Sequence, residues 1–238
     1  MEVLPKYDCH CHILPGLDDG AQTMDEALFL AGKLASYGFE RAVCTAHSSS
    51  LYFNSPETVI RVCYRLQEEL DKAGIDLELI PSLEYRLIPE RWPEVRQKDW
   101  LLPWEGNHIL VELPISKPQK MGDIDAAEEV RQLVKEGLQP VLAHPERYLW
   151  ASKDYYRSLL DAGAAFQRNL GSIEGLYGPQ VSERAIWLLQ EGFYSFLGTD
   201  THNKKYTDAV DQIIGRPKNL SEGASASTLG PENKAKVG

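Results

Sequence analysis

Residues able to bind metal ions are concentrated near the start of this 238-residue chain. The stretch 7–20 reads YDCHCHILPGLDDG and holds two histidines, three aspartates and two cysteines. Imidazole and carboxylate groups gathered in one place are typical of metal centres that activate water. Whether these residues form one site depends on which side chains share a face, and on what the rest of the chain brings beside them.

Metal-capable side chains also recur further along, where apolar segments predicted to be strands come to an end. The carboxyl ends of parallel strands meet at one rim of a barrel, so we expect these side chains to lie together. Five of the six histidines fall in the set, whereas His108 begins a strand instead of ending one. The set is Asp8, His10, His12, His47, Glu84, Glu112, His144, Asp200 and His202, with Asp18 and Asp19 in the loop after the first strand.

The alternation of the first strand separates its candidate ligands from its cysteines. Asp8, His10 and His12 share one face, because successive side chains point to opposite faces. Cys9 and Cys11 are then expected in the core, toward the helices. Imidazole and carboxylate ligands without thiolates favour manganese, iron or zinc over calcium or magnesium. So many ligands exceed the needs of one ion, which predicts two ions and leaves room for a third.

The remaining sequence predicts an α/β fold. Amphipathic helical segments end at glycines and lead into apolar segments, as at 24–38 and 56–74, with Thr23 and Ser55 as expected N-caps. Such repeats predict a parallel sheet with helices outside it. An open doubly wound sheet is the alternative, but the polar strand ends favour a distorted seven-stranded, TIM-like (β/α)7 barrel. After the first strand, the predicted strands are 41–47, 77–87, 108–113, 140–143, 165–170 and 194–199.

Two segments interrupt this pattern. Residues 89–106 contain three tryptophans and three prolines, which predicts a loop insertion with a short helix packed by its own aromatic residues. A substrate lid is the alternative for this segment. From residue 216 the chain lacks periodicity and is rich in small and polar residues, which predicts a disordered tail or a vector-derived sequence. The expected domain is therefore 1–215, followed by the tail 216–238.

The composition excludes several kinds of partner. A formal net charge of −10 argues against nucleic acid or an anionic membrane surface, since both need clustered basic residues. No apolar run approaches the roughly 20 residues that cross a bilayer. Four cysteines are too few and too unevenly spaced for a disulfide framework. We therefore expect reduced thiols in a cytoplasmic protein, and an oligomer is compatible with the sequence.

The motifs, taken in order, resemble those of the polymerase and histidinol phosphatase (PHP) superfamily. The resemblance covers about residues 7–203. Within that superfamily, segments 12–20 and 143–148 look most like the bacterial metal-dependent tyrosine-protein phosphatases of capsule and exopolysaccharide systems. The motifs are Asp8-x-His10-x-His12, Thr45-Ala46-His47, Glu84, Glu112, His144-Pro145-Glu146-Arg147 and Gly198-Thr199-Asp200-Thr201-His202.

This resemblance implies a PHP-fold barrel with three metal ions, usually manganese, with iron or zinc as alternatives. Asp19 is preferred to Asp18 because the family's ligand directly precedes the glycine. Arg147, Asp200 and His202 are the implied catalytic residues, and Arg147 would bind phosphate. The implied ligands are His10, His12, Glu84 and Asp200 for the first ion, Glu84, Glu112 and His144 for the second, and Asp19, His47 and His202 for the third.

Fewer residues point to substrate contacts. The guanidinium fork of Arg147 suits a phosphoryl group, and a surface ion pair with Glu146 is its alternative. Tyr52 and Phe53 are candidates to flank a phosphotyrosine ring, with loop packing as the alternative. The family often has a second phosphate arginine after the last histidine, where this chain offers Lys204 or Lys205, neither of which has the fork. Family members also continue into further C-terminal helices, whereas this tail does not look helical, so the barrel end is expected to be less covered.

We therefore expect a metal-dependent phosphatase acting on phosphotyrosine in a protein, such as a bacterial tyrosine kinase of capsule synthesis. A hydroxide shared by two ions would attack phosphorus in line, and Arg147 would help to neutralise the phosphoryl oxygens. Two alternatives stay open. One is a small-molecule phosphatase with a histidinol-phosphate-like substrate, and the other is a non-catalytic metal-binding docking module.

Overall fold

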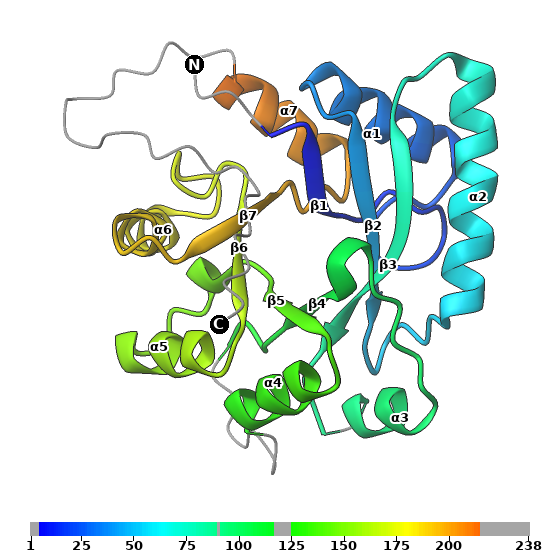
Figure 1. The fold of residues 1–238 in the computed structure, drawn as a ribbon. Helices are drawn as coiled ribbons and strands as arrows, with labels where there is room; N and C mark the ends of the chain where they lie inside the picture. The colour runs from blue at the N-terminus through cyan, green and yellow to red at the C-terminus, as the bar shows by residue number, and fades with distance from the viewer. Residues whose placement is uncertain (1–4, 90, 117–124, 215–238) are drawn as a thin grey trace, which may run out of the picture.

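Seven parallel strands form one sheet whose order in space is their order in the sequence (Figure 1). The computed structural model describes residues 5–89, 91–116 and 125–214, so the predicted tail 216–238 lies outside the described residues. Each strand lies where the sequence predicts one. The strands are β1 (Tyr7–Cys11), β2 (Arg41–Ser48), β3 (Glu78–Arg86), β4 (His108–Glu112), β5 (Gln139–Leu142), β6 (Ala165–Asn169) and β7 (Tyr194–Gly198).

The sheet curls until its first and last strands meet. Just beyond β7, the backbone N–H of Asp200 donates to the carbonyl of His10 at 2.7 Å. The N–H of His12 donates in turn to the carbonyl of Thr201 at 2.9 Å. These bonds join β1 to the chain after β7, at the carboxyl ends of the strands. The result is a nearly closed barrel, which confirms the predicted (β/α)7 fold and is incompatible with a doubly wound strand order.

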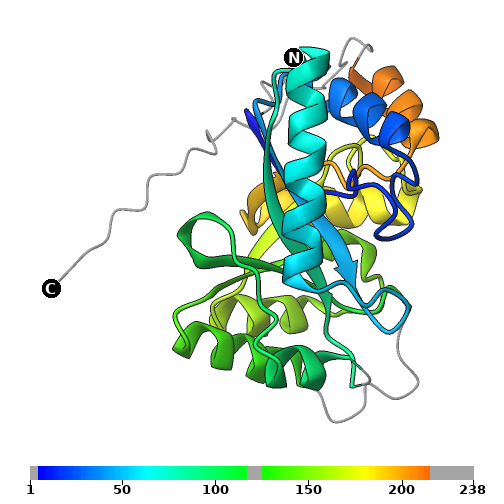
Figure 2. The ribbon, with the colours of Figure 1, turned by 90° about the vertical axis from the view of Figure 1, so that its right-hand side faces the viewer.

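Helices cover the outside of this barrel (Figures 1 and 2). The predicted caps are present: Thr23 accepts from the N–H of Glu26, Ser55 accepts from the N–H of Thr58, and Gly74 adopts a left-handed φ of 68°. The helices are α1 (Met24–Ser36), α2 (Pro56–Ala73), α3 (Trp92–Gln97), α4 (Ala126–Lys135), α5 (Lys153–Asp161), α6 (Pro179–Gln190) and α7 (Lys204–Ile214), with 3₁₀ turns η1 (Glu105–Asn107) and η2 (Pro145–Arg147).

The helix α7 was not expected from the sequence. It packs against α1, where Lys33 Nζ lies 2.6 Å from Asp211 Oδ2 and the hydroxyl of Tyr37 donates to Asp211 at 2.9 Å. Val210 of α7 packs with Leu197 of β7 and with Leu170, so this helix adds cover after the last strand, where the sequence predicted less.

The core has two layers, and they place the two cysteines of β1 differently. Cys11 packs in the layer between strands and helices, as predicted. Cys9 instead packs in a cluster to which all seven strands contribute, including Val43, Leu110 and Val141, and that cluster fills the barrel interior. The prediction for Cys9 was wrong because the pairing of β1 with β2 shifts register between Asp8 and Cys11, which interrupts simple alternation. All four cysteines are buried free thiols.

The tryptophan-rich stretch contains the expected short helix, α3, and packs onto β3. The hydroxyl of Tyr85 donates to the carbonyl of Trp100 at 2.8 Å and accepts from the N–H of Leu102 at 2.7 Å. Trp92 packs edge-on against Tyr85 and donates from its indole to Glu129 of α4. These contacts support a packed insertion over a lid.

None of the helices described here combines the length and the apolar composition needed to span a membrane.

Candidate metal centre

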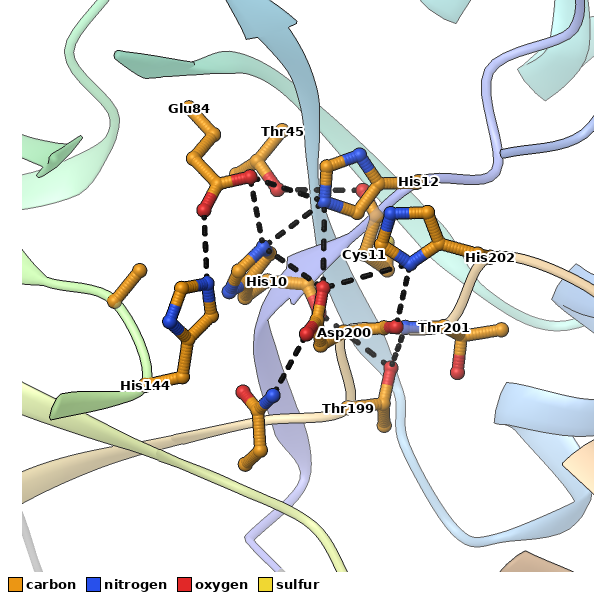
Figure 3. Close-up of polar contacts among 12 residues, drawn as sticks. His10, Cys11, His12, Thr45, Glu84, His144, Thr199, Asp200, Thr201 and His202 are labelled. Atoms are coloured by element: carbon orange, nitrogen blue, oxygen red, sulfur yellow. Dashed lines mark hydrogen bonds and ion pairs between the residues drawn. The ribbon is translucent and has the colours of Figure 1, made fainter. Parts of the chain in front are cut away.

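The barrel brings all nine ligands implied by the resemblance to the carboxyl ends of its strands, whereas the carboxylate of Asp8 accepts from Thr199 instead. Six of them point toward one another in Figure 3. His10 and His12 come from β1 and the residue after it, whereas Asp200 and His202 follow β7. His108, excluded from the set, lies apart and stacks on Trp104. The gathered residues are His10, His12, Asp19, His47, Glu84, Glu112, His144, Asp200 and His202.

Four ligand atoms of the first predicted group converge. His10 Nε2 and His12 Nε2 face each other at 2.9 Å. Glu84 Oε2 lies 3.3 Å from each of these nitrogens, and Asp200 Oδ1 lies 3.3 Å from His10 Nε2 and 3.5 Å from His12 Nε2. This is the geometry of lone pairs directed at a common point.

Glu84 also joins the first group to its neighbours. Its Oε1 lies 3.2 Å from His144 Nε2, and its Oε2 lies 3.0 Å from His47 Nδ1. Glu112 Oε1 lies 3.7 Å from His47 Nδ1, so Glu112 gathers with His47 and Glu84. The resemblance implied Glu112 with His144, but those two do not share a group within the described residues.

The third predicted group gathers at the outer edge of the cluster. Asp19 Oδ1 lies 3.4 Å from His47 Nε2 and 3.7 Å from His202 Nε2, and His12 joins the same group. Asp18 has another role: it is buried, and its Oδ2 lies 2.8 Å from His12 Nδ1 and accepts from the N–H of His47 at 2.9 Å. This arrangement favours Asp19 over Asp18 as the group that faces the cluster.

The cluster fits metal ions by its unsatisfied atoms. Among the described residues, Glu84 Oε2 and His47 Nδ1 are buried 3.0 Å apart but make no hydrogen bond, and His144 Nδ1 makes none either. Glu112 Oε1 also makes no hydrogen bond, although Arg86 Nε lies 2.9 Å away as an ion pair. Buried polar atoms are normally paired, because leaving one unpaired costs about 1–3 kcal/mol. Three of these atoms point into the cluster from three different strands. Divalent cations would satisfy the carboxylate oxygens and imidazole nitrogens together.

A second ring of polar residues orients the candidate ligands. Gln167 Oε1 lies 3.0 Å from His10 Nδ1, and Asn169 donates to Asp200 Oδ2 at 2.7 Å. Together with Asp18, they turn the inner atoms of His10, His12 and Asp200 toward the centre. None of these three roles was predicted from the sequence. In the sequence of β6, only the spacing of Gln167 and Asn169, two residues apart and so on one face, could have indicated that they orient the ligands.

Backbone strain is stored at two of these positions. His144 has a φ of 33° and Asp200 a φ of 57°, a region that non-glycine residues rarely adopt. Gly198, two residues before Asp200, has no room for a side chain. A Cβ there would lie 2.5 Å from His10 Cβ and 2.8 Å from Gln167 Nε2. The end of β7 is thus shaped by its contact with β1.

The charges of the cluster are arranged around Glu84. Burial alone would raise its pKa, but His10 and His47 hold the pKa well below its usual range. Burial and the neighbouring Glu84 raise the pKa of Glu112 to about 7. Arg86 opposes that shift, with Nε 2.9 Å from Glu112 Oε1. Two adjacent buried carboxylates favour cations between them.

Imidazole nitrogens bind metals in the neutral form. Burial and the charge of Arg147 lower the pKa of His144 to about 4, so this ring stays neutral near pH 7. Burial and His12 likewise lower the pKa of His202.

Arg147 lies at the edge of the cluster. Its Nη1 donates to Asp200 Oδ2 at 2.8 Å, and its guanidinium carbon lies 5.2 Å from the centre of the Tyr177 ring. The alternative pairing with Glu146 does not occur. Glu146 is fully buried and accepts from the N–H of Asn169, from Ser172 and from Tyr194.

Tyr52 and Lys204, which are also predicted to contact substrate, lie at different distances from the metal cluster. Tyr52 stacks on His47, with ring centres 5.9 Å apart and an interplanar angle of 14°, so it borders the cluster. Lys204 is exposed at the start of α7, where its Nζ lies 3.9 Å from Asp208 Oδ1 and over the ring of Phe29. In this arrangement Lys204 is engaged with the helix layer.

Comparison with known proteins gives one consistent result. The family "Capsular polysaccharide synthesis, CpsB/CapC" matches residues 6–210. The tyrosine-protein phosphatase YwqE of Bacillus subtilis is 29% identical over 201 residues, covering 83% of this chain and 78% of its own. The tyrosine-protein phosphatase CpsB of Streptococcus agalactiae is 26% identical over 204 residues, covering 82% of each chain.

Solved structures agree with these relatives. A chain from the study of YwqE from B. subtilis and CpsB from Streptococcus pneumoniae, described as unique metal-dependent tyrosine phosphatases, matches with a TM-score of 0.75 at 29% identity, over 87% of this chain and 85% of that one. Histidinol phosphate phosphatase from Lactococcus lactis matches with a TM-score of 0.52 at 12% identity, over 87% and 92%, and so shares the fold. The resemblance seen in the motifs is confirmed, and the chain belongs to the CpsB/CapC family of capsular polysaccharide synthesis.

Proposed function

We propose that this chain is a metal-dependent protein-tyrosine phosphatase. The observation that carries the proposal is the buried ring of unsatisfied carboxylate and imidazole atoms around Glu84, with Arg147 at its edge. The names of the relatives, which are tyrosine-protein phosphatases, support the same reaction. An ordinary ion-pair network would leave fewer buried atoms unpaired.

The proposed cofactor is manganese, as two or three ions per chain, with iron or zinc as alternatives. Mixed imidazole and carboxylate donors support these metals over calcium or magnesium. His10, His12, Glu84 and Asp200 would hold one ion. Glu84 would be shared with a second site, formed with His10 and His144 or with His47 and Glu112, the two other groups in which its carboxylate takes part. Asp19, His47 and His202 would hold a third, at the outer edge.

Bound divalent ions would supply a water nucleophile of lowered pKa and would neutralise phosphoryl charge. The side chains of the protein itself would bind and orient the phosphoryl group. Asp200 fixes one end of the Arg147 guanidinium, so the remaining donors of its fork can meet phosphoryl oxygens at the cluster edge. Tyr177 supports the same guanidinium by a cation–π contact. A tyrosine leaving group, with a pKa of about 10, departs with little help from a general acid.

We further propose that the substrate is a phosphotyrosine protein, such as a tyrosine kinase of capsule synthesis. The description of the family supports the link to capsule synthesis, and the names of the relatives support a phosphotyrosine protein. Buried free thiols are compatible with the reducing cytoplasm, which we propose as the location. Tyr52, stacked beside His47, is the proposed wall for the phosphotyrosine ring.

The test is steady-state hydrolysis by chelator-stripped protein after adding back manganese, zinc, iron or magnesium. The substrates are a phosphotyrosine peptide, the matching phosphoserine peptide and histidinol phosphate. We expect metal-dependent turnover with the highest kcat/KM for phosphotyrosine. A preference for histidinol phosphate would overturn the substrate class but leave the metal centre standing. Metal binding without turnover of any substrate would favour the docking-module alternative.

A further inference from the structure

The turn after β2 is an ordered feature beside the metal centre. Ser48 and Phe53 form an antiparallel bridge, and the N–H of Ser49 donates to the carbonyl of Tyr52 at 3.1 Å. The amide of Asn54 donates to the carbonyls of Leu17 and His47, both at 2.9 Å. The turn is therefore anchored to the loop after β1 and to the end of β2.

This anchored turn presents apolar side chains to solvent. Leu51 at its tip is 78% exposed and Phe53 is 64% exposed. Between them, Tyr52 stacks on His47. Single exposed apolar residues are common on protein surfaces, but these two directly flank in the chain the residue that stacks on a candidate ligand.

The guanidinium group of Arg91 packs against one face of the Phe53 ring. The guanidinium carbon of Arg91 lies 4.6 Å from the centre of this ring and 5.2 Å from that of Trp100. Arg91 is itself fully buried, and its Nη1 donates to Glu94 at 2.7 Å. One face of Phe53 is thus fixed by a cation–π contact while the rest of the ring is open. A pre-oriented aromatic ring binds a partner with little loss of conformational entropy.

We propose that Leu51 and Phe53 form a docking surface for the polypeptide that adjoins the phosphotyrosine of a protein substrate. The proposal rests on the proposed function and adds to it a selectivity for apolar residues next to the phosphotyrosine. Residues next to a phosphotyrosine lie about 3.3–3.6 Å apart along an extended chain, so with the phosphotyrosine ring beside Tyr52 they would be within reach of Leu51 and Phe53. An apolar side chain there would bury surface against Leu51 and Phe53.

The test compares three substrates of the manganese-loaded protein. They are a phosphotyrosine peptide with leucine on both sides of the phosphotyrosine, the same peptide with serine at those positions, and p-nitrophenyl phosphate. The double variant Leu51→Ser/Phe53→Ser removes the surface. The matched control is Tyr64→Ser, which removes an equally exposed aromatic ring from α2 (64% exposed). Binding of both peptides is also measured by titration calorimetry, which needs no turnover.

We expect the wild type and Tyr64→Ser to favour the leucine peptide by about tenfold in kcat/KM and in affinity. The double variant is expected to lose this preference. An unchanged preference in the double variant would overturn the docking surface while the proposed function stands. If the double variant lost as much kcat/KM for p-nitrophenyl phosphate as for the leucine peptide, the docking surface would also be overturned. The turn would then act on the metal centre through Tyr52.

Two further outcomes distinguish the docking surface from the phosphatase activity and from a contact between two copies of the chain. If no substrate is hydrolysed, the proposed function fails, and the calorimetric comparison of the two peptides still decides whether the surface binds. If sedimentation shows that the double variant disperses a wild-type oligomer without changing peptide preference, a second copy of the chain is the occupant and the inference is wrong.

Discussion

Individual residues set the direction of each candidate ligand. Asp18 illustrates this best, because its carboxylate accepts from the N–H groups of His47 and Gly20 and lies against His12 Nδ1. The His12 contact fixes the tautomer that leaves Nε2 free to face the cluster. Asp18 thus acts through His12, whereas its neighbour Asp19 faces the cluster directly.

Replacing Asp18 with asparagine should weaken manganese binding by about 10–100-fold, because the carboxylate that orients His12 is lost while the side chain keeps its size. Titration of the apo protein with manganese measures this effect. Asp25→Asn, an exposed aspartate in the first turn of α1, is the matched control. Equal affinity for the two variants would contradict the role given to Asp18.

Replacing Arg147 with lysine should lower kcat/KM for a phosphotyrosine peptide by about a hundredfold. Lysine keeps the charge beside Asp200 but not the fork that would meet two phosphoryl oxygens. Inhibition by inorganic phosphate should weaken in parallel. A variant with full activity would mean that Arg147 only balances the charge of Asp200.

The sequence predicts the inner residues of the site better than the outer ones. Histidines and carboxylates at strand ends are conspicuous by residue type. Gln167 and Asn169 are not, because amides occur in many structural roles and only their geometry against His10 and Asp200 assigns one here. Arg86 was missed for the same reason, since its pairing with Glu112 depends on the register of β3 with β4.

At the scale of elements, the strands follow from apolar runs and the helix ends follow from caps. Two features did not follow. The register shift in β1 turned Cys9 into the barrel, and such shifts leave no mark in a single sequence. No helix was predicted for the segment of α7, although Tyr206, Val210 and Leu170 meet in a small core of their own.

The end of β7 offers an element-scale test. Gly198→Ala should weaken metal binding and lower the melting temperature, since its Cβ would lie 2.5 Å from His10 Cβ. Gly32→Ala in α1 is the control, because the nearest atom to its new Cβ is a methyl group of Ile75 at 3.8 Å. That control should gain about 0.5–1 kcal/mol of stability. Thermal unfolding and metal titration of both variants check the prediction, and a neutral Gly198→Ala would contradict the close fit of β7 to β1.

The whole molecule concentrates charge at one end of its barrel. Glu84, Glu112 and Asp200 are all buried there, and in the folded state without metal, burial and the charge of Glu84 disfavour the ionised form of Glu112. Ions bound only by the folded chain therefore stabilise it.

Chelation should lower the melting temperature for this reason. Metal at a hundred times its dissociation constant adds about 2.7 kcal/mol to the free energy of unfolding, and two sites add more. Calorimetry with and without a chelator measures the difference. In Glu84→Gln, which loses the residue shared between groups, the response to metal should shrink. If the melting temperature is the same with and without the chelator, the cluster is stable without ions.

The cluster around Glu84 is the proposed hydrolytic centre for phosphotyrosine. The most direct measurement is the turnover of a phosphotyrosine peptide as a function of manganese bound per chain, determined on the same samples by elemental analysis. We predict that turnover is absent in the stripped protein, rises with the bound metal and reaches a plateau when two or three ions are bound. Turnover that survives complete removal of metal, or that is unchanged in Glu84→Gln, would contradict the account.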